Sequence, residues 1–181
     1  MQMSIGASMA ETGAKQDETY RLAVSEHGAA LGRLARAYEA DPELRRDLLQ
    51  DIHVGLWRSF AGFSGQCSLR TWVYRVAHNI ATSHVLRRKR AAKQMSLDAL
   101  DELPDDGNPE ESVGEKQKLD LLTAMIQTLK QPDRQVILLY LEDLDASAIS
   151  EIVGLKPGAV ATKIHRIKAV LASRFRERSA S

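Results

Sequence analysis

The sequence predicts an all-α protein built as two small helical domains that are joined by a flexible acidic linker. Glycine and proline are few, at 11 and 5 of 181 residues, which argues against the many turns of a β-sandwich or barrel. Apolar residues recur at spacings of three and four along much of the chain, as on one face of a helix. Residues 96–115 interrupt this pattern with eight acidic residues and no lysine or arginine, which indicates a linker.

The first domain is predicted to cover residues 18–95, after a disordered leader at 1–17 that shows no periodicity. Asp41-Pro42 separates two of its helices, because proline disfavours a helical residue before itself and starts helices well. A glycine-containing loop over 61–68 precedes the third helix. The predicted helices run from Tyr20 to Tyr38, from Pro42 to Phe60, and from Leu69 into the charged segment 86–93.

The second domain is predicted to cover residues 116–178 and is again helical. Apolar stripes over 119–129 and 136–140 predict its first two helices. Asp145 is placed to cap a short third helix, Gly154 to end it, and Pro157 to open a last helix. A short helix, a tight turn and a second helix form the pattern of a helix-turn-helix.

The composition limits the classes of protein to be considered. Lysine and arginine total 25 against 24 acidic residues, so any nucleic-acid surface must come from local clustering of charge. The single cysteine, Cys67, excludes an internal disulfide framework and a cysteine-rich zinc site. With no membrane-length apolar run and no secretory signal, we expect a cytoplasmic protein. No catalytic constellation, phosphate-binding loop or metal-ligand cluster is present, so neither enzyme activity nor a cofactor is predicted.

The last helix of the predicted helix-turn-helix has the side chains that reading of duplex DNA requires. Small residues let a helix approach the major groove, while donors and cations contact base edges and phosphates. The alternative is an ordinary helical hairpin with a solvated basic face. The residues expected on the exposed sides of this last helix are Lys156, Ala161, Thr162, His165, Arg166 and Lys168.

A second basic cluster ends the third helix of the first domain, and aromatic residues gather around the loop before that helix. Aromatic rings beside cations are typical of sites for single-stranded nucleic acid, where bases stack and phosphates are neutralised. The alternative is that most of these rings belong to the core. The cations are Arg87, Arg88, Lys89, Arg90 and Lys93, and the aromatic residues are Trp57, Phe60, Phe63, Trp72 and Tyr74.

Three blocks of the sequence resemble bacterial sigma factors of the extracytoplasmic-function group. Ser68–Arg90 (SLRTWVYRVAHNIATSHVLRRKR) is similar to their promoter-melting and −10-reading segment. Asp47–Phe60 (DLLQDIHVGLWRSF) is similar to the helix that docks on the β′ clamp of RNA polymerase. Leu129–Leu171 resembles the domain that reads the −35 element. The blocks follow one another in the order found in the family.

The resemblance implies three groups of site residues. The loop before the third helix would hold an unstacked −10 base, and the cations beyond would hold strand phosphates. The polymerase-docking group is Asp47, Leu48, Gln50 and Asp51. The −10 group is Phe63, Ser64, Ser68, Thr71, Trp72, Arg75, Asn79, Arg87, Arg88 and Arg90. The −35 group is Lys156, Ala161, Thr162, Lys163, His165 and Arg166.

The resemblance further implies a transcription initiation factor with three partners. These are core RNA polymerase, through its β′ clamp and β subunit, promoter DNA as a −35 duplex and a melted −10 strand, and an anti-sigma factor. The recognition helix reads GAVATK where the family commonly has GTVKSR, so Ala161 replaces a basic residue and the promoter sequence is not predicted. The alternatives are a free-standing helix-turn-helix regulator and an interaction protein that does not read promoters.

Overall fold

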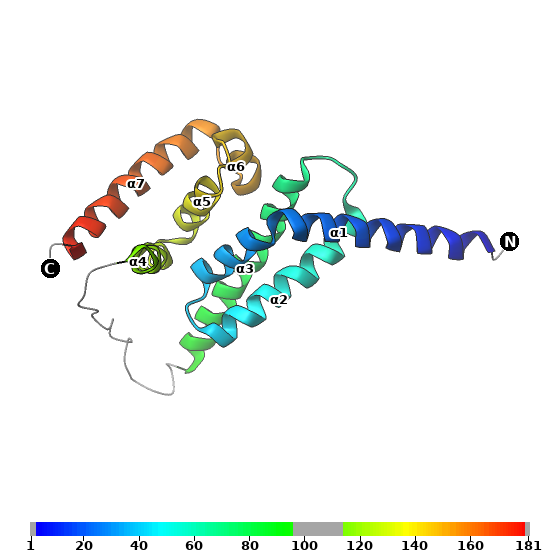
Figure 1. Ribbon diagram of the computed structural model, residues 1–181, viewed down its shortest axis with the longest axis horizontal. Coiled ribbons are helices and arrows are strands. Elements are labelled where there is room, and N and C mark those ends of the chain that lie inside the picture. The colour runs from blue at the N-terminus through cyan, green and yellow to red at the C-terminus, as the bar shows by residue number, and fades with distance from the viewer. Residues whose placement is uncertain (1–2, 96–113, 180–181) are drawn as a thin grey trace.

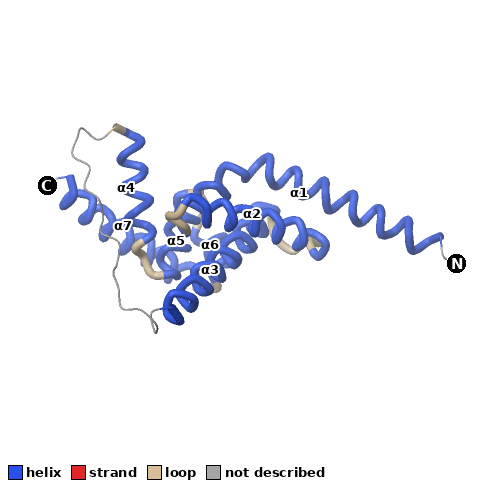
Figure 2. The backbone as a smooth tube through the Cα atoms, turned by 90° about the horizontal axis from the view of Figure 1, so that it is seen from below, coloured by secondary structure: helices blue, strands red, loops and turns tan. Residues whose placement is uncertain are grey.

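The protein is described by a computed structural model in which residues 3–95 and 114–179 are placed. Throughout these residues the secondary structure is helical, and no strand occurs among them, as predicted (Figure 2). The helices form two bundles that lie side by side (Figure 1). The first bundle contains α1 (Met3–Tyr38), α2 (Pro42–Ser59), the short 3-10 helix η1 (Phe60–Gly62) and α3 (Leu69–Met95). The second bundle contains α4 (Glu115–Gln127), α5 (Gln131–Leu141), α6 (Ala146–Val153) and α7 (Pro157–Ser179).

The first bundle forms because each of its three long helices has one apolar face. Asp41 caps α2, accepting hydrogen bonds from the amides of Glu43 and Leu44, and Pro42 is its first residue. These local signals set the sharp turn between α1 and α2. The side chains buried between the helices include Leu31, Leu34, Leu48, Ile52, Leu56, Val73 and Ala77.

Helix α1 begins much earlier than the sequence predicts. It starts at Met3, so the segment expected to be a disordered leader continues the helix, which projects beyond the bundle in Figure 1. Two contacts hold this extension near the end of α2. The Gln16 amide donates to the Trp57 carbonyl at 2.6 Å, and the Trp57 indole donates to Asp17 at 2.8 Å. The sequence alone does not reveal these contacts, because they join residues about 40 positions apart.

The second bundle contains the predicted helix-turn-helix in α6 and α7. The Asp145 carboxylate accepts from the Ala148 amide at 2.8 Å and so caps α6. Gly154 ends α6 with φ of 72°, a left-handed conformation that glycine adopts without strain, and Pro157 opens α7. The core beneath this motif includes Ile126, Val136, Leu139, Ile149, Val160 and Ile167.

The two bundles pack directly against each other. Helix α1 contacts α4, and α3 contacts both α5 and α6. The predicted acidic linker lies outside the described residues except at its end, where Gly114 precedes α4. None of the helices in the described ranges combines the length and the apolar character that crossing a bilayer requires.

Candidate polymerase and nucleic-acid interfaces

The predicted docking helix presents three of its four candidate residues to solvent. Asp47, Gln50 and Asp51 are exposed on α2, whereas Leu48 is 0% exposed. Leu48 lies in the core with Ile52, because residues four apart share one face of a helix. The expectation that Leu48 faces a partner is therefore corrected: it supports the helix that carries the acidic face.

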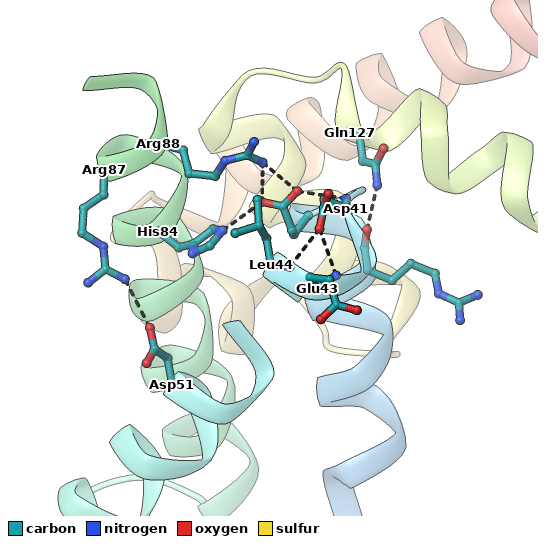
Figure 3. Close-up of polar contacts among 10 residues, drawn as sticks. Asp41, Glu43, Leu44, Asp51, His84, Arg87, Arg88 and Gln127 are labelled. Atoms are coloured by element: carbon teal, nitrogen blue, oxygen red, sulfur yellow. Dashed lines mark hydrogen bonds and ion pairs between the residues drawn. The ribbon is translucent and has the colours of Figure 1, made fainter. Parts of the chain in front are cut away.

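The acidic face of α2 is linked to the basic end of α3. Arg87 donates to the Asp51 carboxylate at 3.3 Å, and Figure 3 shows the two side chains reaching across from neighbouring helices. Both side chains are mostly exposed, so the pair contributes little to stability. This ion pair therefore joins Asp51, a predicted polymerase contact, to Arg87, a predicted DNA contact.

The loop before α3 is ordered by its own side chains. The Gln66 amide oxygen accepts from the backbone amide of Ser64 at 2.8 Å and from its hydroxyl at 3.1 Å. Ser68 accepts from the Thr71 amide at 3.0 Å and donates to the Thr71 hydroxyl at 2.9 Å, which caps the start of α3. Because Thr71 is buried, its role is to begin the helix, and a DNA contact by its side chain is not supported.

The aromatic residues beside this loop form a wall that is anchored to the core. The Trp72 indole donates to Ser59 Oγ at 2.9 Å, and its ring centroid lies 5.3 Å from that of Phe63. Phe63 in turn packs edge-on against Phe60, which is buried. Phe63 and Trp72 are only partly buried, so each keeps some ring surface that a base can contact.

The arginines at the basic end of α3 are all exposed, but one of them, Arg88, is paired with a buried carboxylate. Arg88 donates to both oxygens of Glu39 at 2.7 and 2.6 Å, and His84 pairs with the same carboxylate at 2.9 Å. Figure 3 shows Arg88 and His84 converging from α3. Glu39 is 3% exposed; burial alone raises the pKa of its carboxyl, but the bonds from His84 and Arg88 outweigh burial and lower the pKa. Arg88 is therefore tied to the fold, while Arg90 is exposed, and among the described residues no carboxylate is paired with it.

The start of α3 is tied to the second bundle through Glu142, the residue that ends α5. Arg33 of α1 donates to both carboxylate oxygens of Glu142 at 2.7 Å. The Tyr74 hydroxyl donates to the same carboxylate at 3.3 Å, and Arg70 donates to the Glu142 carbonyl. Burial, together with the Glu142 charge, raises the pKa of Tyr74 to about 12. Glu142 thus gathers three donors from the first bundle.

A predicted −10 contact takes part in the same junction. Arg75 on α3 donates to the Glu151 carbonyl of α6 at 3.2 Å, which places it against the helix-turn-helix. Asn79, one turn further along α3, is exposed. The face predicted to meet −10 DNA is therefore partly covered by the second bundle in this arrangement.

Helix α7 presents most of its predicted base-reading residues to solvent. Lys156, Ala161, Thr162 and His165 are exposed, and the Thr162 hydroxyl donates back to the Gly158 carbonyl at 3.0 Å. Two other predicted contacts, Lys163 and Arg166, share the carboxylate of Asp133 at the start of α5.

An apolar groove lies between the bundles and has arginines at its rim. Its volume is about 760 Å³, and it is lined by residues of all five helices from α1 to α5. Leu119 and Leu141 are exposed beside it, although both are large apolar side chains. The arginines that line it are Arg33, Arg36, Arg45 and Arg46.

Sequence reasoning missed the carboxylates that organise these surfaces. Glu39, Asp133 and Glu142 hold arginines from segments 33 to 109 residues away. Their only signal in the sequence is an acidic residue at a helix end, which is common in surface helices. In the described ranges, no group of three or more His, Cys, Asp or Glu side chains is placed to hold a metal ion.

Together these features define a two-bundle helical protein with a helix-turn-helix and a second basic surface beside an aromatic loop. The family model of sigma-70 region 2 matches residues 23–91, and that of sigma-70 region 4 matches residues 119–171. The chain therefore belongs to the RNA polymerase sigma factors, in their extracytoplasmic-function group.

The similarity to individual proteins is low in identity and broad in coverage. The RNA polymerase sigma factor YlaC of Bacillus subtilis is 28% identical over 129 residues, which are 70% of this chain and 74% of YlaC. SigG of Mycobacterium tuberculosis is 25% identical over 163 residues, covering 76% of this chain but only 44% of SigG. The sigma factor RpoE of Bartonella quintana, solved with the anti-sigma factor NepR, shares the fold at a TM-score of 0.69 and 18% identity, covering 87% of this chain and 96% of RpoE.

Proposed function

We propose that this chain is a transcription initiation factor that binds core RNA polymerase and directs it to promoters by reading their −10 and −35 elements. The observation that carries the proposal is the pairing of two DNA-binding surfaces in one chain: the aromatic loop with the end of α3, and the helix-turn-helix. In this proposal the protein acts by binding, without catalysing a reaction of its own. It works in the cytoplasm, where polymerase and promoters are found.

The docking surface in this proposal is the acidic face of α2. Asp47, Gln50 and Asp51 are exposed on a helix whose opposite face is buried, so they are held rigidly without being needed by the core. Charge on such a face steers association and sets specificity. We place the β′ clamp here.

The −10 surface combines a stacking wall with exposed polar and basic residues of α3. Phe63 and Trp72 offer ring surface to an unstacked base, and the hydrogen-bonded loop over 63–68 offers backbone groups beside them. Asn79 and Arg90 extend this surface along α3 toward the strand phosphates. The second bundle contributes α7 for the −35 duplex.

The two bundles must separate before both elements can be read. The names of the elements place them about 25 base pairs apart, which is roughly 85 Å of B-form DNA at about 3.4 Å per base pair. In the closed arrangement, however, Arg75 of the −10 surface directly contacts Glu151 of the helix-turn-helix. We infer that the Glu142 junction opens when the protein joins polymerase.

Transcription in vitro tests the proposal. Purified core polymerase is supplied with a genomic fragment library, with and without this protein, and the transcript starts are mapped. We expect starts that depend on the protein and share two upstream elements. Asp51→Arg should abolish them without unfolding the chain, because exposed substitutions usually cost under about 0.5 kcal/mol.

Two results would contradict the proposal. One is sequence-specific DNA binding with no dependent transcript, which indicates a free-standing helix-turn-helix regulator. The other is core polymerase pulled down at wild-type strength by a folded Asp51→Arg variant, which removes the docking surface from α2. Arg58→Glu, an exposed charge reversal near the end of α2, is the matched control and should retain activity.

We further propose that an anti-sigma factor occupies the groove between the bundles. An apolar floor with an arginine rim fits an amphipathic helix that carries acidic residues at its edges. Such a helix would hold the bundles together and block separation. Arg36→Glu should weaken that complex, while transcription with core polymerase alone stays unchanged.

A further inference from the structure

The Asp133 carboxylate connects the first turn of α5 to the recognition helix α7. One of its oxygens accepts from Lys163 Nζ at 2.5 Å, and the other accepts from Arg166 Nη2 at 2.9 Å. The carboxylate is 21% exposed, and the two cations differ in exposure, at 26% for Lys163 and 62% for Arg166. One anion therefore holds two cations that differ in their access to DNA.

The local structure explains why this contact is firm. Asp133 lies in the first turn of α5, where a negative charge is favoured by the helix dipole. Lys163 and Arg166 are three residues apart on α7, so both face the same neighbour, and α5 packs along α7. Burial alone raises the pKa of the Asp133 carboxyl, but the two cations outweigh burial and lower the pKa, which keeps the group charged.

This contact occupies the ammonium group of Lys163 but only part of the Arg166 guanidinium. Lys163 has one ammonium group, and that group rests on the carboxylate in a largely covered position. Arg166 uses one terminal nitrogen for Asp133, and its guanidinium has further donors on the exposed side. Fixing one nitrogen also restricts the rotation of the guanidinium plane, which prepares it for a bidentate contact.

We propose that Asp133 is a positioning residue that determines −35 specificity: it orients Arg166 toward a base edge and withholds Lys163 from the DNA. The inference rests on the proposed reading of −35 DNA by α7. It also changes the expected −35 contacts. Lys163 is no longer expected to contact DNA, and Asp133 is added as a residue that orients Arg166.

A positioning role and a purely structural role predict opposite changes in binding. Removing the Asp133 charge frees Arg166 and Lys163, so both cations can reach phosphates of any sequence. Nonspecific affinity should then rise, while discrimination between bases at one position falls. Loss of a structural contact would instead weaken binding to every sequence.

The test uses the full chain with core polymerase and duplex DNA. A randomised duplex library first gives the −35 sequence preferred by the wild type, and a panel of single-base-pair substitutions then measures discrimination. Asp133→Asn should reduce discrimination at one position about tenfold and raise affinity for unrelated duplex severalfold. Asp133→Glu, which keeps the charge, should restore most of the discrimination.

Two comparisons separate positioning from damage to the fold. Asp145→Asn removes a capping carboxylate of the same bundle whose recorded hydrogen bond is to the Ala148 amide, so it should leave base discrimination unchanged. Arg166→Ala should lose discrimination at the same base pair as Asp133→Asn. Combining the two substitutions should add little, because both act on one contact.

The outcomes distinguish this inference from the proposed function. If the wild type prefers a sequence and Asp133→Asn keeps that preference, the positioning role is wrong and −35 reading stands. A uniform loss of affinity in Asp133→Asn also overturns it. If the wild type with polymerase shows no −35 preference at all, the proposed function fails, and the role of Asp133 fails with it.

Discussion

Each bundle holds an arginine of a proposed DNA-binding surface on one carboxylate, but the two carboxylates lie at different depths. Glu39 in the first bundle is almost fully buried and binds Arg88 and His84, whereas Asp133 in the second remains partly open and binds Lys163 and Arg166. A buried carboxylate links its arginine to the stability of the fold, although the Arg88 side chain is still 52% exposed. A carboxylate near the surface leaves its arginine partly free and restricts its direction. The depth of the anion therefore indicates how much stability the fold would lose if the arginine left its carboxylate to bind DNA.

The largest expected effect is on the stability of the first bundle. Glu39→Ala removes a buried anion and leaves His84 without its acceptor, which should destabilise the bundle by about 2–3 kcal/mol. Urea unfolding followed by tryptophan fluorescence measures this directly, since Trp57 and Trp72 both lie in the first bundle.

A matched control separates burial from charge. Glu43→Ala removes an exposed carboxylate that pairs with Arg46, and should change stability by under about 0.5 kcal/mol. Equal losses of unfolding free energy in Glu39→Ala and Glu43→Ala would show that the buried and the exposed carboxylate contribute alike to stability.

The second effect is a dependence of stability on pH that is confined to the first bundle. Burial lowers the pKa of His78 to about 3, and its Nδ1 lies 2.9 Å from the Tyr38 hydroxyl, so the folded state holds the imidazole neutral. Below pH 6.5 the His78 imidazole binds a proton in the unfolded chain but stays neutral in the folded chain. Stability should therefore fall by up to about 1.4 kcal/mol per pH unit from pH 6.5 to 5.

Replacing His78 tests the source of this slope. His78→Gln should flatten the pH dependence of the fluorescence transition, leaving the smaller share from His27 and His53, whose pKa values burial also lowers. His165→Gln, an exposed substitution in the second bundle, is the matched control. A slope that persists fully in His78→Gln would show that the buried imidazole is not its cause.

The smallest effect concerns single-stranded DNA. Arg90→Gln should lower the salt dependence of binding by about 0.7 in the log–log slope, the value for one phosphate contact on a single strand. Arg88→Gln should leave that slope nearly unchanged and instead weaken the fold, because Arg88 is held by Glu39. The reverse result would mean that Arg88 leaves Glu39 to bind DNA.

Local signals predicted most of the fold. Asp41-Pro42, Asp145, Gly154 and Pro157 each mark a helix boundary that the structure confirms, because capping and backbone conformation depend on a few neighbouring residues. The start of α1 was predicted too late, since its contacts to Trp57 come from far along the chain.

The functional surfaces were predicted less completely. The sequence shows where cations cluster, but their availability depends on partners that only folding brings near, such as Glu39 for Arg88 and Asp133 for Lys163. Leu48 was assigned to the docking face although its place in the apolar stripe of α2 indicated the core. The assignment of roles within each cluster therefore required the tertiary structure.

We expect the two bundles, which pack against each other in the free chain, to separate so that their proposed DNA-binding surfaces can span a promoter. Spin labels at Ser83 on α3 and Ala172 on α7, both exposed, with Cys67→Ser to remove the native thiol, allow the distance between the bundles to be measured. Double electron–electron resonance should show one short distance in the free protein, and a distance longer by tens of ångströms in the complex with core polymerase and promoter DNA. An unchanged distance in a complex that initiates transcription would contradict the account.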